Sequence, residues 1–323
     1  MKIKRLKLST EINEQFNKLY ADSNSIFNTY SWLNNFSPNL SLYGIFDDGN
    51  NLIGDFFLYR EIRFGLNFYR NPPFTPMIGP FLKINAKNPV AIMSKWREAL
   101  TLMANFFDKL DYAVISVSLA RDIVDTLPFI WKKFKVIPAY TYIIDLKESH
   151  DVIYKRMSPE RRNDISKGIK DGLSVKKIDD MRIVKSLVLN TFARQEKKTN
   201  EYYLDKVLFN FANEDNSFAF ATFKDNHPIA CTFCICDKTA NYYLLGGYDQ
   251  YNKHHGAGPL SIWEAIKYAK DISLKCFDFE GSIVPQIEKY FRGFGGQLIP
   301  YYRVNKARLP LEIILKFIKR ELF

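Results

Sequence analysis

The feature that most constrains the fold is a repeat of predicted elements in the two halves of the chain. Residues 41–59 read as a strand, a polar turn and a longer strand. Residues 217–236 show the same pattern, again with a short polar turn between two apolar runs. Apolar runs joined by Asp, Asn and Gly are typical of β-hairpins. We therefore expect two related domains, each built around one hairpin.

Helical and strand patterns flank the two hairpins in the same order. Apolar residues at helical spacing precede and follow each hairpin, and a strand pattern comes after the second helix. The predicted helices are 11–20, 89–110, 181–192, 202–211 and 259–271, and the predicted strands beyond the hairpins are 112–117, 241–245 and 275–279. This order predicts an α/β (α+β) chain with two mixed sheets, each flanked by helices.

The boundary between the domains is expected near residues 145–150. Residues 140–146 have a strand pattern, and Ser149 suits the N-cap of the helix that follows. No glycine- and serine-rich linker separates the halves, which predicts packed domains over 1–145 and 146–304.

Charge and length exclude some classes of protein. The 323 residues are 47% hydrophobic, which is enough for a sizeable core, and the net charge of +11 favours anionic partners. No apolar run reaches the roughly 18 residues that a membrane-spanning helix needs, and residues 1–10 lack the apolar core of a signal peptide. The expected location is cytoplasmic, with a membrane-peripheral position as an alternative.

Three of the four cysteines lie in one apolar segment. Cys234 and Cys236 would share one face of a strand while Cys231 points to the other, and no second Cys/His cluster follows. We expect buried reduced thiols and no metal site.

A short glycine loop is the clearest candidate for a binding site. Lys253, Gly256 and Gly258 lie between a predicted strand and a predicted helix. Main-chain N–H groups at such a helix start, together with the helix dipole, suit a phosphate. The alternative is a plain strand-to-helix turn, since the loop lacks the Lys-Ser/Thr of a P-loop.

Basic residues form a second group of candidates for contacting phosphate. Arg161, Arg162 and Lys167 follow the helix start at Ser158 and Pro159, and Arg194 ends another helical segment. Arginine can hold a phosphate or carboxylate through two parallel hydrogen bonds. The alternative for each is an ordinary solvated cation.

Two acidic residues follow the strand pattern at 275–279. Asp278 or Glu280 could orient an attacking amine or accept its proton. Capping of the next helix is the alternative role. The four histidines show no arrangement typical of a Ser/His/Asp or Cys/His hydrolase.

The C-terminal residues 309–323 are amphipathic and basic. The apolar residues of this segment are Leu311, Ile314, Leu315, Ile318 and Leu322, and the basic residues are Lys316, Lys319 and Arg320. Such a helix either touches a membrane surface or packs its apolar face on the protein, and the second is commoner.

The order of these motifs resembles that of a known family. The matching residues are Arg161-Arg162-Asn163, Lys167, Lys170, Gly172, Thr191-x-x-Arg194, Tyr243-Leu-Leu-Gly246, Gly256, Gly258, Asp278-Phe-x-Gly281 and Phe291-x-x-Phe294-Gly295-Gly296. The chain resembles the FemABX family of tandem GNAT-fold aminoacyltransferases, the methicillin-resistance-factor-like proteins. The resemblance is strong over residues 141–304. It is weaker over 1–140, where Trp32 and the proline-rich segment 72–80 are similar to the family's first domain.

The resemblance implies two tandem GNAT-like domains and transfer of an aminoacyl group from charged tRNA to an amine of a peptidoglycan precursor. It implies no tightly bound cofactor, with aminoacyl-tRNA or acyl-CoA as the donor. Acceptor phosphates would bind near Trp32 and Arg194, with Tyr301 as a further substrate-binding candidate. Residues 305–323 would form a C-terminal helix that packs back on the first domain. The lysine that members often carry shortly after the tryptophan motif is absent, since the next lysine is Lys83.

Three functions remain open at this stage. The first is a cytoplasmic aminoacyltransferase of the FemABX type. The second is an acyl-CoA-dependent N-acyltransferase that holds the diphosphate on Lys253, Gly256 and Gly258. The third is a binding module without catalysis for an anionic polymer or a membrane surface.

Overall fold

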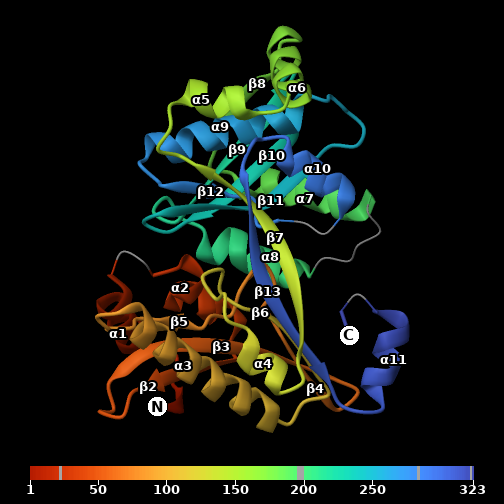
Figure 1. Ribbon diagram of the computed structural model, residues 1–323. Coiled ribbons are helices and arrows are strands. Elements are labelled where there is room, and N and C mark those ends of the chain that lie inside the picture. The colour runs from red at the N-terminus through yellow and green to blue at the C-terminus, as the bar shows by residue number, and fades with distance from the viewer. Residues whose placement is uncertain (22–23, 195–199, 282–283, 321) are drawn as a thin grey trace. The chain divides into compact units, whose positions relative to one another are not determined.

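The computed structural model describes residues 1–21, 24–194, 200–281, 284–320 and 322–323, and only the main chain of Arg194 (Figure 1). The chain divides into two compact units. Unit 1 consists of Met1–Ala139 and Pro300–Phe323, and unit 2 consists of Tyr140–Ile299. The chain therefore leaves unit 1 once, forms the whole of unit 2, and then returns.

Unit 1 contains one mixed sheet with helices on both faces. Its strands lie in the order β1-β2-β3-β4-β6-β13, with β5 paired to β3. The pair β4–β6 is parallel, and the other pairs described by their registers are antiparallel. The elements are β1 (Lys2–Leu6), α1 (Thr10–Tyr20), η2 (Ile26–Asn28), α2 (Tyr30–Leu33), η3 (Asn34–Phe36), β2 (Leu40–Phe46), β3 (Leu52–Arg63), β4 (Leu66–Arg70), β5 (Phe81–Leu82), α3 (Pro89–Lys109), β6 (Val114–Ser118), α4 (Leu127–Trp131), the start of β7 (Lys135–Asp145), the end of β13 (Gln297–Ala307) and α11 (Leu311–Ile318).

The core of unit 1 follows from the alternation of side chains along β3. Phe56 points to one face, where its ring lies 5.7 Å from that of Phe107 on α3. Phe57 points to the other face and stacks near Phe81. Both Phe56 and Phe57 are fully buried. Because β3 presents apolar residues to both faces, helices cover the sheet on both sides.

Unit 2 contains a second mixed sheet with strands in the order β7-β12-β11-β10-β9-β8. Here the pair β11–β12 is parallel, and the flanking pairs are antiparallel. The elements are the end of β7, α5 (His150–Arg156), α6 (Pro159–Lys170), β8 (Ser174–Ile178), α7 (Met181–Arg194), α8 (Glu201–Asp205), the π-helix η4 (Lys206–Phe211), β9 (Ser217–Lys224), β10 (His227–Cys236), β11 (Ala240–Tyr248), α9 (Ala257–Asp271), β12 (Cys276–Asp278), α10 (Pro285–Arg292) and the start of β13.

The cysteines show how helices cover both faces of β10. Cys234 and Cys236 join the buried cluster formed with α9, whereas Cys231 lies against Val184 of α7. All three thiols are buried and free. Among the described residues, no three His, Cys, Asp or Glu side chains gather in a metal-binding arrangement.

The two sheets repeat one plan, which confirms the α/β repeat predicted from the sequence. In each, an edge strand precedes a hairpin, the hairpin's second strand pairs with a third, and that third strand has a parallel neighbour. The predicted caps Ser149 and Ser158 are also confirmed, since both side chains accept hydrogen bonds from the first turn of their helices.

The C-terminal segment corrects one prediction. Residues 305–307 belong to β13 and not to a helix, because Asn305, Lys306 and Ala307 pair with β6. The helix α11 begins only at Leu311. No helix in the described part of the chain is long and apolar enough to cross a bilayer.

Candidate functional site

A cavity opens in unit 2 where strand β11 parts from strand β12. The two strands pair over three residues, the last pair being Tyr242 with Asp278, and β11 then continues to Tyr248. Beside this continuation lies a cavity of about 450 Å³. Its lining comes from β10, β11, α7, α10, the loop before α9 and the first turns of α9, and consists of Thr191, Cys231, Thr232, Tyr243, Gly246, Gly247, Tyr248, Lys253, His254, His255, Gly258, Pro259, Ile262 and Tyr290.

The loop before α9 is held in place by Tyr248. The Tyr248 hydroxyl accepts a hydrogen bond from the His254 N–H at 2.5 Å and donates one to the His254 carbonyl at 3.1 Å. The Tyr248 N–H in turn donates to the Thr191 hydroxyl at 2.9 Å. One strand end thus fixes both α7 and the loop at the mouth of the cavity.

The His254 ring ties the same loop to α6. Its Nδ1 accepts the Gly256 N–H at 3.0 Å, and its Nε2 lies 3.0 Å from Asp171 Oδ2. Because an N–H can only donate, Nδ1 must be unprotonated, so the neutral ring carries its proton on Nε2 and donates it to Asp171. This bond lowers the pKa of the Asp171 carboxyl. Both ring nitrogens are engaged, which makes His254 a positioning residue.

Gly256 and Gly258 serve different purposes in the loop. A Cβ on Gly256 would lie 2.3 Å from the Asp164 carbonyl oxygen and 2.8 Å from the Gly168 Cα. Gly256 therefore allows α6 to pack on the loop. A Cβ on Gly258 would lie 2.9 Å from the Tyr290 hydroxyl, inside the cavity lining.

Most of the N–H groups at the start of α9 are already used. The Gly256 N–H donates to His254 Nδ1, and the Ala257 N–H donates to the His254 carbonyl at 3.0 Å. Pro259 has no N–H to offer. Of this first turn, Gly258 is the position that both carries an N–H and lines the cavity. The loop therefore offers an anion fewer main-chain N–H groups than its glycine spacing predicts.

Three buried titratable groups on the cavity wall keep their protons. Burial raises the pKa of the Tyr243 and Tyr290 phenols well above their usual value. Burial also raises the pKa of the Cys231 thiol to about 12. At neutral pH these groups keep their protons, so the phenols can donate hydrogen bonds and the thiol is a poor nucleophile.

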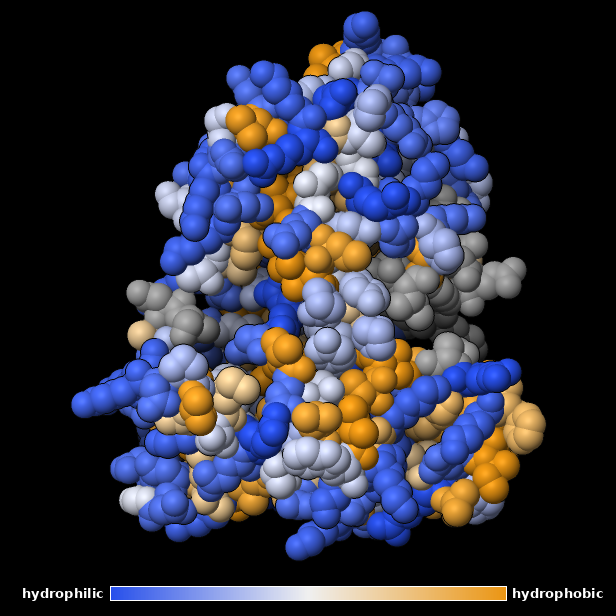
Figure 2. Space-filling model, viewed as in Figure 1, coloured by the Kyte–Doolittle hydropathy of each residue, from blue (hydrophilic) through white to orange (hydrophobic). Residues whose placement is uncertain are grey.

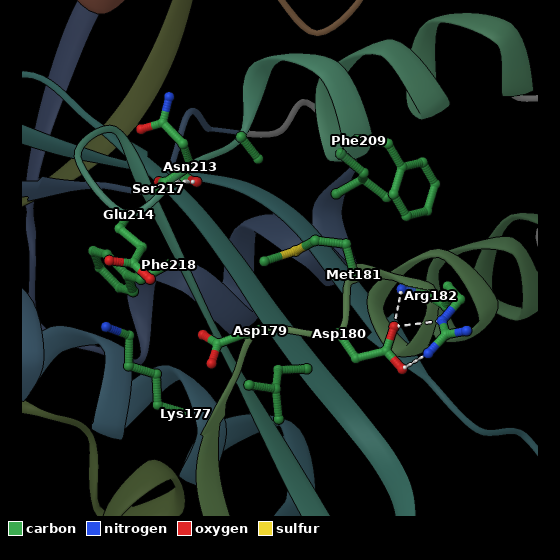
Figure 3. Close-up of a pocket in the computed structure, with 13 residues that line it drawn as sticks. Lys177, Asp179, Asp180, Met181, Arg182, Phe209, Asn213, Glu214, Ser217 and Phe218 are labelled. Atoms are coloured by element: carbon green, nitrogen blue, oxygen red, sulfur yellow. Dashed lines mark hydrogen bonds and ion pairs between the residues drawn. The ribbon is translucent and has the colours of Figure 1, made fainter.

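A second hollow in unit 2 is a weaker candidate. It has a volume of about 410 Å³ and lies between the start of α7 and the end of η4 (Figure 3). Asp180 binds Arg182 there through both carboxylate oxygens, at 2.8 Å each. Asp179 and Glu214 add further negative charge to the lining. Carboxylates at this helix start oppose the binding of a phosphate.

The predicted donor-site residues are brought together in the cavity only in part. Lys253 is exposed, and it lines the cavity together with Gly258. Gly256 is buried against α6 and does not line it.

The prediction that Arg161 and Arg162 form a phosphate-contacting surface is corrected. Arg161 is 5% exposed, pairs with Asp164 at 2.8 Å, and lies over the Tyr290 ring at 4.3 Å. Arg162 donates to the carbonyls of Lys155 and Met157 and so caps the end of α5. The packing of α6 on α5 and α10 uses both guanidinium groups. Lys167 stays exposed on α6.

The predicted acidic residues lie at the point where β12 ends. Asp278 is 1% exposed, and its Oδ1 accepts the Thr141 hydroxyl at 2.5 Å and the Glu280 N–H at 2.9 Å. Glu280 and Gly281 both have positive φ and form the turn after β12. Neither carboxylate lines the cavity. The geometry gives Asp278 the role of holding the turn at the parting of the strands.

The remaining predicted residues lie elsewhere. Trp32 is fully buried in unit 1, where its Nε1 donates to Thr75 at 3.0 Å, and binding of acceptor phosphates near it stays a prediction. Tyr301 is half-buried on β13 in unit 1. The side chain of Arg194 lies outside the described residues.

Sequence reasoning did not assign a role to Tyr248, Tyr290 or His254. Each is an ordinary residue in its local pattern, and its role depends on side-chain contacts that the pattern does not show. The available signal was their place next to the glycine loop and within the family's motif order.

Comparison with known proteins agrees with this geometry. Residues 160–292, which contain the whole cavity, match the family described as the acetyltransferase (GNAT) domain. Unit 2 carries a GNAT domain. A search of curated proteins gave no match.

Solved structures extend the likeness to the whole chain. FemX aligns with 98% of this chain and 100% of its own, at a TM-score of 0.67 and 12% identity. A C-terminal domain assigned to lysylphosphatidylglycerol synthetase of Agrobacterium fabrum covers 95% and 96%, at a TM-score of 0.54 and 9% identity. A tandem GNAT protein from the clavulanic acid biosynthesis pathway covers 95% and 98%, at a TM-score of 0.54 and 11% identity. The chain therefore has the tandem GNAT fold, which confirms the predicted fold and its resemblance to FemABX proteins.

Proposed function

We propose that this chain is an acyltransferase that takes an aminoacyl group from charged tRNA and transfers it to an amine. The observation that carries the proposal is the cavity at the parting of β11 and β12, next to the start of α9 in a GNAT domain. A cavity of about 450 Å³ is large enough for a small acyl group and the adjoining part of its carrier.

The loop geometry favours charged tRNA over coenzyme A as the donor. A diphosphate bound at a helix start relies on several free N–H groups. Here the Gly256 and Ala257 N–H groups are satisfied by His254. A tRNA 3′ end brings single phosphates and a large anionic body, which the net charge of +11 attracts at long range.

In the proposed reaction, the acceptor amine forms a C–N bond with the ester carbonyl carbon and the C–O bond to the tRNA ribose breaks. The proton lost by the amine ends on the ribose oxygen that leaves. The neutral phenols of Tyr243 and Tyr290 line the cavity and can donate hydrogen bonds to developing negative charge on oxygen. Asp278 acts as a positioning residue for the strand end, and Lys253 contacts donor phosphate at the cavity mouth.

We place this reaction in the cytoplasm, where charged tRNA is available. The proposed acceptor is an amine of a peptidoglycan precursor, on the strength of the FemABX resemblance. The name of the lysylphosphatidylglycerol synthetase neighbour adds an aminoacylated lipid as the matching alternative.

The test is a titration of labelled charged tRNA at fixed salt, with coenzyme A as competitor and deacylated tRNA as control. Ionic strength is fixed because affinity driven by phosphate contacts falls steeply with salt. We expect tight binding of charged tRNA that coenzyme A does not displace. Saturable coenzyme A binding without tRNA binding would contradict the choice of donor. If neither binds, the cavity is not a donor site, and the reading as a non-catalytic binding module replaces the proposal.

A second candidate function is N-acyl transfer from acyl-CoA. The match to an acetyltransferase domain favours it, as does the exposed Lys253 next to the Gly258 N–H. In that case a C–S bond breaks in place of the C–O bond, and calorimetry with acetyl-coenzyme A would give saturable heat.

A further inference from the structure

One end of unit 1 exposes apolar side chains from two separate elements. On α11 these are Ile313, Ile314, Phe317 and Ile318, and at the turn between β3 and β4 they are Ile62, Phe64 and Leu66. Phe64 is 100% exposed and Phe317 is 86% exposed. We call these seven residues the α11–hairpin surface. Single exposed apolar residues are common, but seven exposed apolar residues at one end of a unit indicate an interaction surface.

The two elements are neighbours at that end of the sheet. Main-chain hydrogen bonds link Ala113 to Asn67 of β4 at 2.8 Å and Arg308 to Ala113 at 3.0 Å. The chain therefore leaves β13 towards α11 at the same sheet end where the hairpin turns. Leu311 and Leu315 of α11 pack on the cluster that also takes Phe68 of β4. Figure 1 shows α11 beside β4.

The apolar character of α11 is wider than its contact with the protein requires. In α11, Leu311 and Leu315 pack against the buried cluster of unit 1. No residue of α11 is fully buried. At 100° per residue, Ile313 and Phe317 lie on the far side from Leu315. This helix is therefore apolar on the side that faces away from its own unit.

Cations border the apolar residues. Lys316, Lys319 and Arg320 are exposed on and just after α11. In the hairpin, Arg63 lies over the Phe68 ring at 6.0 Å. Orange and blue spheres alternate over this part of the molecule in Figure 2. Apolar side chains flanked by Lys and Arg are the pattern of a helix that lies in the headgroup region of a bilayer.

We propose that the α11–hairpin surface binds the face of an anionic lipid bilayer. Phe64 and Phe317 enter the boundary between headgroups and acyl chains, and Lys316, Lys319 and Arg320 contact lipid phosphates. A second copy of this chain is a poorer occupant, because a two-fold contact would bring these cations together on a chain of net charge +11. The surface lies in unit 1 and is independent of the cavity in unit 2.

The test is co-sedimentation of the full chain with vesicles. One set contains equal parts of phosphatidylglycerol and phosphatidylcholine, and the other contains phosphatidylcholine alone, at one fixed salt concentration. We expect binding to the anionic vesicles. Phe317→Ser and Phe64→Ser should each lower the partition coefficient about tenfold, since each removes a large apolar side chain from the bilayer. The double variant K319E/R320E should weaken binding to the anionic vesicles.

The matched control is Val90→Ser. Val90 is 74% exposed in the first turn of α3, and Arg308 contacts the other end of that helix. The 21 residues of α3 put these ends roughly 30 Å apart. Val90→Ser should leave vesicle binding unchanged. Binding of charged tRNA should be unchanged in Val90→Ser, Phe64→Ser and Phe317→Ser, which keep the net charge of +11.

Three outcomes would overturn the proposal. One is absence of binding of the unmodified chain to anionic vesicles. Another is an equal loss on Val90→Ser, which would show that the surface is not specific. The third is a concentration-dependent dimer in light scattering that Phe317→Ser abolishes, which would make the surface an interface between copies. Melting curves of each variant would show that it is folded.

Discussion

Unit 1 and unit 2 share one strand order but differ in what occupies the place beside the parallel strand pair. In unit 2 the long strand β11 runs on past β12 and leaves a cavity. In unit 1 the strand β4 stops at Arg70, and the chain returns to the sheet at residues 77–80. The Ile78 N–H donates to the Ser118 carbonyl and the Ala120 N–H to the Gly79 carbonyl. The returning chain thus closes in unit 1 the gap that stays open in unit 2.

Since both units have the same strand order, the candidate site depends on the segment that follows the third strand, β4 in unit 1 and β11 in unit 2. In unit 1 that segment is rich in proline, and Met77 and Ile78 are buried within the sheet layer. In unit 2 the segment is a short glycine loop that leads straight into α9. A donor site is therefore expected in unit 2 alone.

The largest expected difference between the units is in how the ionisable group that each sheet buries changes stability with pH. Each sheet buries an ionisable group, Asp55 in unit 1 and Cys231 in unit 2. Burial raises the pKa of Asp55 to about 7, although Tyr20 and Asn28 donate hydrogen bonds to its Oδ1. Its Oδ2 has no partner among the described residues. The folded chain therefore holds a proton that the unfolded chain loses at lower pH.

The free energy of unfolding should fall as pH rises from about 4 to about 7 and then level off. At about 1.4 kcal/mol per pKa unit, the Asp55 contribution is about 4 kcal/mol. Asp55→Asn should remove this fall, as measured by urea unfolding across the pH range. Cys231→Ser is the matched change in unit 2, and it should leave the fall in place, because the pKa of the Cys231 thiol lies near 12. An unchanged pH profile in Asp55→Asn would contradict the assignment.

Opening the filled gap in unit 1 should cost stability without creating a donor site. Ile78 is fully buried, so Ile78→Ala should lower the free energy of unfolding by about 2–5 kcal/mol through lost burial and a residual void. Urea unfolding measures the loss. Donor binding should be unchanged under native conditions, and a variant that stays folded yet loses donor binding would break the contrast between the units.

Filling the cavity in unit 2 should lower activity and leave stability almost unchanged. Gly258→Val places branched bulk beside the Tyr290 hydroxyl, in the first turn of α9. We expect kcat/KM to fall at least about hundredfold, or about 2.7 kcal/mol of transition-state binding, with a small change in Tm. Ala91→Val adds bulk in the first turn of α3 in unit 1 and serves as the matched control. Normal turnover in Gly258→Val would show that the cavity does not hold the reacting groups.

The smallest expected effect separates positioning from proton transfer at Asp278. Asp278→Asn keeps an oxygen that can accept from Thr141 and from the Glu280 N–H, so stability and turnover should change little. Asp278→Ala removes that acceptor and should cost about 1–3 kcal/mol of stability. If Asp278→Asn folds normally but loses turnover, the carboxylate itself takes part in the proton transfer.

Local sequence patterns predicted the hairpins, the helix caps and the repeat of the fold. Hairpins, helix caps and the repeat depend on neighbours within a few residues, which is why Ser149, Ser158 and both hairpins were predicted correctly. The resemblance to FemABX proteins supplied the fold family. The location of the glycine loop before a helix was also predicted, and the structure adds the cavity beside it.

Side-chain contacts and the pairing of distant segments could not be predicted from the sequence. Arg161 belongs to a basic run, yet it is buried because Asp164 and the Tyr290 ring compensate its charge. The Gly256 N–H is unavailable because a histidine two residues earlier points back at it. The family resemblance implied a helix from residue 305, but residues 305–307 pair with β6 and belong to strand β13. In each case a partner far away in sequence, or a side-chain orientation, decides the outcome.

The return of the chain to unit 1 at Pro300 sets an order for synthesis. Unit 2 is continuous, so its strands β8 to β12 are all synthesised before β13 is complete. One edge of β6 in unit 1 stays unpaired until Arg303–Ala307 have been synthesised, although most of unit 1 is synthesised before unit 2. The half that is made first is therefore the half that is finished last, and the nascent chain carries an open strand edge throughout the synthesis of unit 2.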